Sequence, residues 1–407
     1  MRRTLIALAL SASFGGAAIS EGTQSFDRIE RGRYLAILGD CTGCHTAPGG
    51  APFAGGLTLA TPFGNLIAPN ITPDQDTGIG HWTTDEFVSA VRDGRGHNGT
   101  RLYPAMPYPA YTKMSDDDVL ALRSYFLTVT PVHNPVVANQ LPFPFNIRLS
   151  MLFWNAVNFS PGRFQPDPQK SPQWNRGAYL VQGPGHCVTC HTPKNLLGGD
   201  KSNAALQGAV LQGWFAPNIT GNERIGIARW SNDDLVRYLR SGANAWTLAS
   251  GPMAEAVSHS TSQMTDEDLA AIAAYLKGNE SGGGTSAPAA PDRNTMQAGA
   301  AIYKDNCAAC HRDSGSGDEA LFPRLAGSPL VQSEDTSTLV RIVLQGSRAV
   351  STPSAPTGPA MPPFDWRLDD AQVAAVLTYI RNNWGNAAAP VESAAVKNGR
   401  ASLASFP

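Results

Sequence analysis

The sequence has no excess of charge of either sign. Its 407 residues contain 31 Lys and Arg against 33 Asp and Glu, which gives a formal net charge of -2 at pH 7. Proteins that bind nucleic acids usually carry clustered positive charge that neutralises phosphates. No nucleic-acid partner is therefore expected.

Long apolar runs are also missing after the first twenty residues, so no transmembrane helix is expected there. The first twenty, MRRTLIALALSASFGGAAIS, begin with two arginines, continue with a short apolar run and end in small residues. This order is typical of a secretory signal peptide, which predicts cleavage after residue 20. A retained anchor is the alternative, and the shortness of the apolar run disfavours it. The mature chain is expected at the periplasmic face of the cytoplasmic membrane, with peripheral membrane association at most.

Catalytic signatures are missing as well. The sequence contains no dinucleotide-binding fingerprint, no nucleophile elbow and no clear acid-base constellation. No catalytic residues are predicted, and any catalysis is expected to reside on a partner chain.

No cysteine is left over for a disulfide, although the chain has six and is expected to be exported. All six fall into three copies of one pattern: CTGCH at 41–45, CVTCH at 187–191 and CAACH at 307–311. Three copies of CxxCH are typical of c-type haem attachment, in which two thiols bond the haem and the histidine ligates its iron. The predicted attachment residues are Cys41, Cys44, Cys187, Cys190, Cys307 and Cys310, and the predicted proximal ligands are His45, His191 and His311.

A structural zinc site and a redox site can also contain CxxC. A structural zinc site needs four protein ligands, and no free cysteine remains to complete one. A redox CxxC does not require a following histidine three times out of three. Three covalently attached haem c groups are therefore the preferred prediction.

The segments around the motifs repeat too. A short helical pattern with a glycine (Gly32, Gly177 or Gly299) and an aromatic residue (Tyr34, Tyr179 or Tyr303) precedes each motif. A helix with Tyr125, Tyr275 or Tyr379 near its end closes each unit. The pentapeptide APNIT occurs at 68–72 and 216–220. Thr83 with Glu86, and Ser231 with Asp234, resemble capping boxes at the start of a middle helix. These repeats predict an all-α protein of three tandem domains, at 21–132, 174–280 and 293–389, with connections at 133–173 and 281–292 and a tail at 390–407. The tyrosines are expected to pack over the glycines.

Each unit offers a methionine in a predicted loop before its last helix: Met106, Met253 and Met361. A thioether sulfur suits an iron held on its other side by histidine. Met114 and Met264 compete in the first two units, and pattern position favours Met106 and Met253. Met253 is followed by Ala and not Pro, and His259 lies six residues on, so ligation by two histidines is the alternative in the second unit.

Trp82 and Trp230 occupy matching positions in the first two units. An indole N–H there could reach a haem propionate, or the rings could simply pack at a helix start. His81, His97, His133 and His186 have no repeated counterpart and are predicted to be structural.

The connection at 133–173 contains LPFPFNIRLSMLFWNAVNF, a stretch dense in aromatic and aliphatic residues. It is too short to cross a bilayer. Packing across the first two units is the preferred interpretation. A docking face for a partner subunit or the membrane is the alternative, and substitutions at Phe153 and Trp154 separate the two.

Taken together, the signal segment, the three CxxCH units and the methionine segments resemble the three-haem cytochrome c subunit of membrane-bound bacterial dehydrogenases. That family serves flavin-dependent gluconate, sorbitol and fructose dehydrogenases, quinoprotein alcohol dehydrogenases and some aldehyde dehydrogenases. The resemblance implies class I cytochrome c-like domains, a flavin- or quinone-dependent catalytic partner, and electron delivery to ubiquinone. A free periplasmic shuttle, a cytochrome arm of a terminal oxidase, and a haem peroxidase with an open second iron are the alternatives.

Overall fold

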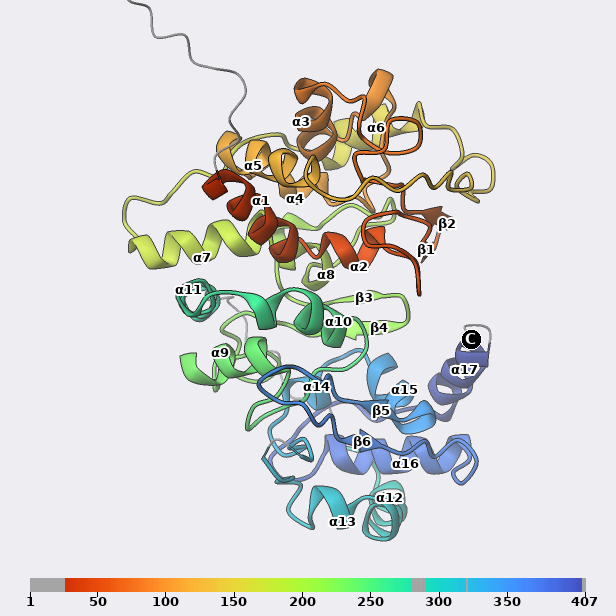
Figure 1. Cartoon of the computed structure of the whole chain (residues 1–407). Helices are drawn as coiled ribbons and strands as arrows, with labels where there is room; N and C mark the ends of the chain where they lie inside the picture. Colours follow the sequence, from red (N-terminus) through yellow and green to blue (C-terminus); the bar gives the residue numbers. More distant parts are fainter. Residues whose placement is uncertain (1–25, 280–287, 289, 320, 405–407) are drawn as a thin grey trace, which may run out of the picture.

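Three helical units follow one another from the top to the bottom of Figure 1, and unit 2 lies between units 1 and 3. The computed structural model describes residues 26–404 except 280–287, 289 and 320. The predicted signal segment and most of the predicted connection at 281–292 lie outside the described residues. No helix in the described ranges is long and apolar enough to cross a membrane.

Unit 1 comprises α1 (Phe26–Leu38), α2 (Cys41–His45), β1 (Thr58–Thr61), β2 (Gly64–Ile67), α3 (Thr84–Asp93), η1 (His97–Gly99), α4 (Tyr108–Tyr111) and α5 (Asp116–Phe126). Unit 2 comprises α7 (Pro172–Gln182), α8 (Cys187–His191), η2 (Ser202–Ala204), β3 (Ala209–Leu211), β4 (Trp214–Ala216), α9 (Asn232–Ser241), α10 (Pro252–His259), η3 (Thr261–Gln263) and α11 (Asp266–Lys277). Unit 3 comprises α12 (Arg293–Asn306), α13 (Ala308–His311), α14 (Pro329–Gln332), α15 (Ser337–Gln345), β5 (Ser347–Arg348), β6 (Ala360–Met361) and α16 (Asp370–Arg381). Outside the units lie α6 (Ser150–Asn158) and α17 (Ser393–Ala404).

In every unit the first and last long helices cross at a glycine. A Cβ atom on Gly32 would lie 1.9 Å from the carbonyl oxygen of Ala121 and 2.7 Å from Cβ of Tyr125. Gly177 meets Ala271 and Tyr275 in the same way, and Gly299 meets Ala375 and Tyr379. The predicted packing of the tyrosines over the glycines is therefore confirmed, and only a residue without a side chain permits these crossings.

The middle helices α3 and α9 begin as the sequence predicts. Helix α3 begins with a reciprocal capping box between Thr83 and Glu86, and α9 begins with one between Ser231 and Asp234. Such boxes satisfy backbone N–H groups that the first helical turn leaves without partners.

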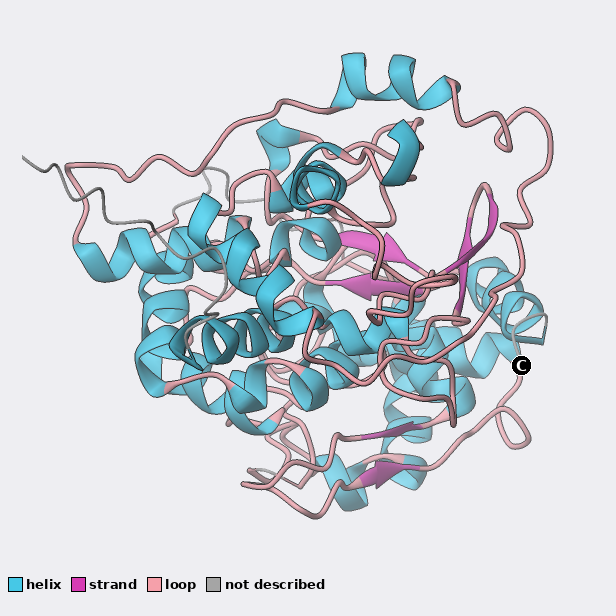
Figure 2. Cartoon of the chain, turned by 45° about the horizontal axis from the view of Figure 1, so that its top comes forward, coloured by secondary structure: helices cyan, strands magenta, loops and turns pink. Residues whose placement is uncertain are grey.

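The structure is mostly helical, but it contains three short antiparallel hairpins that the all-α expectation did not include (Figure 2). β1 pairs with β2, β3 with β4, and β5 with β6. Each strand has two to four residues, too few for a period-2 pattern to stand out in the sequence.

Two separate hydrophobic cores hold the chain together. The first runs without interruption through units 1 and 2, from Leu35 to Leu276, and the second belongs to unit 3, from Tyr303 to Val396. Helix α17 extends the second core because Val396 is fully buried and Arg400 Nε lies 2.9 Å from Asp370 Oδ1. Units 1 and 2 thus fold around one shared core.

Candidate haem-attachment sites

Each CxxCH motif lies on a short helical turn that directly follows the first long helix of its unit. In units 1 and 2, the residue before the first cysteine adopts a left-handed conformation, with φ of 44° at Asp40 and 35° at His186. This reverses the chain between the two helices. The third motif follows α12 without such a residue, because Cys307 itself ends that helix.

The three motif histidines share one backbone contact. Nδ1 of His45 lies 2.8 Å from the carbonyl oxygen of Pro69, Nδ1 of His191 lies 2.7 Å from that of Pro217, and Nδ1 of His311 lies 2.9 Å from that of Pro323. A carbonyl only accepts, so Nδ1 carries the proton and Nε2 keeps its lone pair. Ligating histidines are typically oriented in this way.

Burial lowers the pKa of His45, His191 and His311 below the ordinary value for histidine. The charged imidazolium is disfavoured when it loses water, although the prolyl carbonyls act in the opposite direction. All three rings are therefore held in the neutral form that can ligate a metal.

The six thiols are free of disulfides. Burial raises the pKa of Cys41 and Cys187 to about 12 and that of Cys44 and Cys307 to about 11. Redox CxxC motifs depend on a lowered thiol pKa, so these thiols lack the property that such chemistry requires. Within the described residues, no three His, Cys, Asp or Glu side chains are placed together to hold a metal ion.

The candidate methionines lie in three different local structures. Met106 lies in the segment before α4, Met253 in the first turn of α10, and Met361 in β6, paired with Ser347. A loop was expected in all three units, so α10 and β6 were missed. Proline at the start of α10 and a two-residue strand give little periodicity to detect.

Burial separates the favoured methionines from their competitors. Met114 and Met264 are 1% and 3% exposed and belong to the hydrophobic core, whereas Met106 and Met253 are partly exposed. A side chain committed to core packing has little freedom to turn toward an iron. This difference favours Met106 and Met253, and the assignment of all three distal ligands stays a prediction.

One buried polar atom supports the fit of a haem. Nε1 of Trp230 is buried and has no hydrogen-bond partner, although its ring packs edge-on against Tyr238 at 5.5 Å. Buried N–H groups are normally paired, so this donor matches the polar edge of a bound group. Two free thiols, an oriented neutral imidazole and this donor together fit a c-type haem.

The remaining histidines contact protein groups. His97 Nδ1 lies 2.8 Å from Glu86, His81 Nδ1 contacts the carbonyl oxygen of Gln75, and His133 lies 3.5 Å from Asp74. His259 lies 3.5 Å from Asp40 in the neighbouring unit. These contacts give each ring a structural partner.

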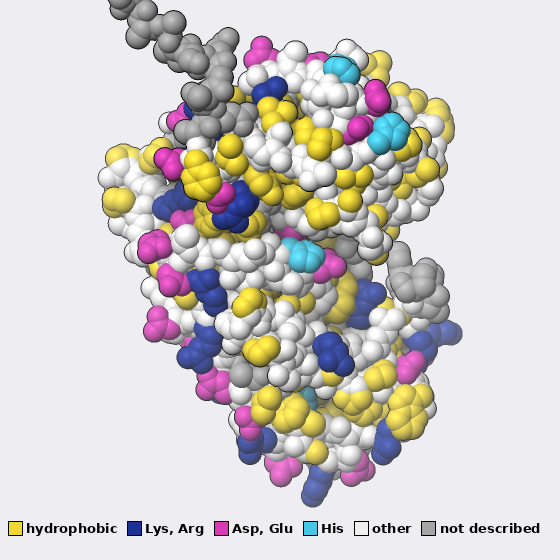
Figure 3. Space-filling model, viewed as in Figure 1, with side chains coloured by type: hydrophobic (Ala, Val, Ile, Leu, Met, Phe, Trp, Pro, Cys, Tyr) yellow, Lys and Arg dark blue, Asp and Glu magenta, His cyan; other side chains and the backbone are white. Residues whose placement is uncertain are grey.

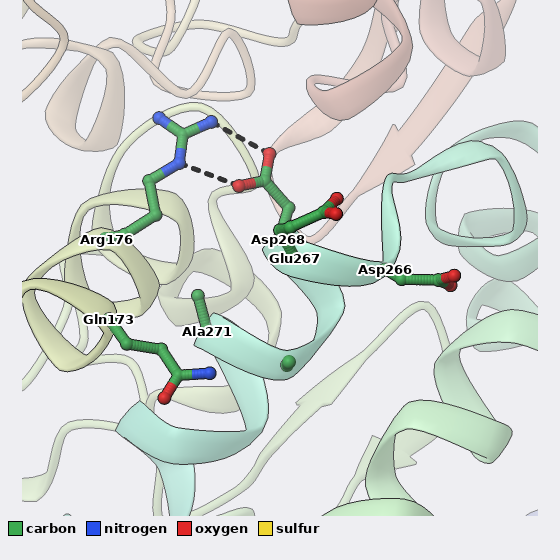
Figure 4. Close-up of a pocket in the computed structure, with 7 residues that line it drawn as sticks. Gln173, Arg176, Asp266, Glu267, Asp268 and Ala271 are labelled. Atoms are coloured by element: carbon green, nitrogen blue, oxygen red, sulfur yellow. Dashed lines mark hydrogen bonds and ion pairs between the residues drawn. The ribbon is translucent and has the colours of Figure 1, made fainter.

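A mirrored set of polar contacts joins units 1 and 2. Tyr34 Oη donates to Asp268 at 2.8 Å, and Tyr179 Oη donates to Asp118. Arg31 pairs with Asp118, and Arg176 pairs with Asp268 through two 2.8 Å bonds, as Figure 4 shows for α7 and α11. In each unit the arginine and the tyrosine of this cluster lie on the first long helix, and the aspartate lies on the last long helix.

Unit 3 lacks this set. Counting from the crossing glycines, its corresponding residues are Ala298, Ala301 and Gln372, in place of arginine, tyrosine and aspartate. It contacts unit 2 through other groups: Thr338 Oγ1 accepts from the backbone N–H of Phe215 at 2.7 Å, and Arg341 lies over the Trp214 ring. Unit 2 therefore meets its two neighbours through different surfaces.

The sequence of the chain was compared with known proteins. The sequence model of the family described as "Cytochrome c" matches residues 29–130, 175–280 and 296–384. The gluconate 2-dehydrogenase cytochrome c subunit of Pantoea cypripedii is 42% identical over 95% of this chain and 92% of its own length. The cytochrome c subunit of the quinone alcohol dehydrogenase of Gluconobacter oxydans is 38% identical over 95% and 84%. The fructose dehydrogenase cytochrome subunit of Gluconobacter japonicus is 38% identical over 92% and 82%.

Proposed function

The chain belongs to the family of cytochrome c subunits of dehydrogenase complexes, and from this premise we propose that it carries three covalently attached haem c groups between a dehydrogenase and ubiquinone. The observation that carries the proposal is the threefold recurrence of a CxxCH turn whose histidine Nδ1 is held by a prolyl carbonyl. The location proposed is the periplasmic face of the cytoplasmic membrane.

The chain's own residues perform three tasks in this proposal. The paired cysteines would hold each haem, the prolyl carbonyls orient the histidine whose Nε2 would ligate its iron, and Met106, Met253 and Met361 would be the second protein ligands. Bound haem supplies reversible one-electron chemistry. An iron held by a histidine and a methionine would leave no position for a substrate, so oxidation of the substrate is assigned to a catalytic partner.

The arrangement of the units supports a relay. Unit 2 contacts unit 1 through the mirrored Tyr and Asp pairs, and unit 3 through Arg341 and Thr338. An electron that travels between the outer units therefore passes through unit 2. Acidic and basic side chains are interspersed on the face seen in Figure 3.

The test uses the protein purified from its native membranes. Alcohols, aldehydes, polyols and sugar acids are added one at a time while the α-band of reduced haem is recorded. Prompt reduction by one substrate class supports the subunit role and identifies the catalytic partner. Reduction only by a chemical reductant, with no catalytic subunit present, would instead favour the free shuttle.

The number of haems is tested separately. The mass of the holoprotein should exceed that of the polypeptide by three haems, and Cys187→Ser with Cys190→Ser should remove one of them. A haem count other than three, or loss of all haem in this variant, contradicts three independent attachment sites.

A further inference from the structure

Helix α17 lies outside the repeated part of the chain, yet it packs closely against unit 3. It lies beside α15 and α16, the helices that precede and follow Met361 in the chain (Figure 1). Val396 is fully buried, and a Cβ atom on Gly399 would lie 2.7 Å from Cγ1 of Val340 on α15. The apolar side of α17 is therefore docked on the core of unit 3.

Arg400, near the end of α17, donates three hydrogen bonds to one turn of unit 3. Its Nε lies 2.9 Å from Asp370 Oδ1, and its Nη1 donates to the carbonyl oxygen of Asp365 at 3.1 Å. Its Nη2 donates to the carbonyl oxygen of Leu368 at 3.0 Å. A guanidinium group holds its N–H donors in a rigid plane, so bonds to three different residues fix the position of the turn relative to α17. We call residues 365–370 the Arg400 turn.

The Arg400 turn directly follows the segment that carries Met361. Only residues 362–364 separate Met361 from Asp365, and two of these three are prolines. Because proline fixes φ, this short connection can absorb little displacement of the turn. On its other side, Met361 pairs with Ser347 of β5, and the backbone N–H of Phe364 donates to a carbonyl oxygen of α15 at 2.9 Å. The Met361 segment is thus held from two sides, by the α15–β5 region and by α17.

Units 1 and 2 hold their candidate methionines by a helix of their own. The carbonyl oxygen of Met106 accepts from the backbone N–H of Tyr108 at 2.7 Å, at the start of α4. Met253 lies in the first turn of α10. In unit 3, residues 362–369 are all described and contain no helix or strand, and α16 begins only at Asp370. The bonds from α17 therefore take the place of a local helix after Met361.

The placement of the backbone matters because a methionine side chain has three rotatable bonds and adapts easily to its surroundings. Only a fixed backbone keeps its sulfur at one position. A methionine ligand opposite histidine raises the reduction potential of a haem, so a loosely held sulfur would lower it.

We propose that Arg400 is a positioning residue for Met361: it holds the Arg400 turn so that the sulfur stays available to the iron of the third haem. The inference rests on the proposed function, which assigns Met361 as the second protein ligand in unit 3. Arg400 itself contacts the turn and not the haem ligand, so it acts through the backbone of residues 362–370. The third site is then controlled from a helix outside the repeated unit.

The test titrates the oxidised, haem-loaded full chain with imidazole and records the sulfur-to-iron charge-transfer band. An imidazole nitrogen takes the position that the sulfur leaves, and no electron is transferred. In Arg400→Gln, one thioether should be displaced at an about tenfold lower imidazole concentration than in wild type, because the bonds that hold its backbone are lost. A spectroscopic redox titration should show a lower midpoint potential for one haem and unchanged potentials for the other two.

Two variants of α17 are the controls. Lys397 is exposed on the same helix, so Lys397→Ala removes one positive charge without the three bonds. Val396→Ala removes buried methyl groups from the packing of α17 and should lower the melting temperature, but it leaves the bonds of Arg400 in place. Both should titrate with imidazole as wild type does. A shift in Val396→Ala equal to that in Arg400→Gln would overturn the inference, because general stability would then explain it.

Met361→Ala separates failure of the proposed function from failure of this inference. It should weaken the band by about a third, and adding Arg400→Gln to it should have no further effect. A band at full strength in Met361→Ala overturns both the ligand assignment and the inference. A weakened band in Met361→Ala, with wild-type titration in folded Arg400→Gln, overturns the inference alone.

Arg400→Lys serves if Arg400→Gln does not fold. Lysine keeps the charge but lacks the planar set of donors, so a smaller shift in the same direction is expected. Wild-type titration of Arg400→Lys would then overturn the inference.

Discussion

Nε2 of His186 lies 3.1 Å from the carbonyl oxygen of Gly39, so the residue before the second CxxCH is bonded to the turn before the first. Tyr111 Oη donates to the same carbonyl at 3.2 Å, and its ring meets the His186 ring edge-on at 5.6 Å. Ser260 Oγ donates to the neighbouring carbonyl of Leu38 at 3.1 Å. The two attachment segments are therefore one connected structure, and a displacement of one is transmitted to the other.

His186→Ala should lower the midpoint potentials of the haems of units 1 and 2 together and leave that of unit 3 unchanged. Loss of the contact admits water to both attachment segments, and solvent exposure lowers haem potentials. A spectroscopic redox titration measures the three potentials. His133→Ala is the control, because that side chain is 61% exposed and remote from the turn. A shift confined to one haem would show that the contact does not couple them.

Asp268→Asn should lower the free energy of unfolding of the module of units 1 and 2 by about 1–3 kcal/mol. Its carboxylate accepts hydrogen bonds from Tyr34 and Arg176, and an amide cannot accept from both with the same strength. Denaturant unfolding followed by circular dichroism measures the change. Glu30→Gln, which removes an exposed pair with Arg33, should cost less than about 1 kcal/mol. Equal effects of the two substitutions would contradict the importance of the mirrored contacts.

Gly32→Ala should destabilise unit 1 by about 1–3 kcal/mol or more, because the added methyl group overlaps the carbonyl of Ala121 and forces α1 away from α5. Thermal unfolding of the holoprotein measures the loss. Gly162→Ala is the matched control, since nothing lies within 4 Å of the added atom. An unchanged melting temperature in Gly32→Ala would mean that α1 and α5 can move apart without loss of stability.

Met106→Ala and Met361→Ala should each reduce the sulfur-to-iron charge-transfer absorption of the oxidised protein, since each removes one thioether ligand. Met114→Leu preserves core volume and should leave the band at full strength. If the band persists in both alanine variants and falls in Met114→Leu, the competing methionine is the ligand in unit 1.

The stability that Glu86 gives to α3 should disappear in acid. Hydrogen bonds from the backbone N–H groups of Thr83 and Asn98 lower the pKa of Glu86 to about 2. Because the folded pKa lies below the unfolded value, the contribution is complete above about pH 4.5 and is lost as the pH falls toward 2. The difference in free energy of unfolding between wild type and Glu86→Gln should therefore narrow from pH 6 to pH 3. A difference that stays constant over this range would exclude the carboxylate as its source.

The features that the sequence predicted are those with short-range signals. CxxCH spacing and capping boxes involve neighbours a few residues apart, and the structure has the capping boxes as expected. The glycine crossings join residues far apart in the chain, and the threefold repeat indicated them. The repeat also indicated that Tyr125, Tyr275 and Tyr379 would pack alike.

The features that the sequence did not predict depend on contacts between residues far apart in the chain. Pro69 follows His45 by 24 residues, and the repeat of APNIT, which contains it, does not by itself indicate a contact with the motif histidine. Tyr34 and Tyr179 were grouped with Tyr303 as one aromatic position. In the structure Tyr303 is buried in its own unit and donates to the carbonyl oxygen of Arg312 at 2.6 Å, while the other two reach across to the neighbouring unit. No local pattern distinguishes an aromatic residue that packs inward from one that joins two units.

The contacts between the motif histidines and the prolyl carbonyls also affect how much the sequences of the three units can differ. The acceptor is a main-chain carbonyl, so substitution of the acceptor residue's side chain does not delete it. Pro323 illustrates this tolerance: it follows His311 by only 12 residues, outside any APNIT segment, yet it accepts at 2.9 Å as Pro69 and Pro217 do at 2.8 and 2.7 Å. Loops of different sequence can thus preserve the same orientation of the motif histidine, so the third unit can vary in sequence here while His311 keeps its backbone contact.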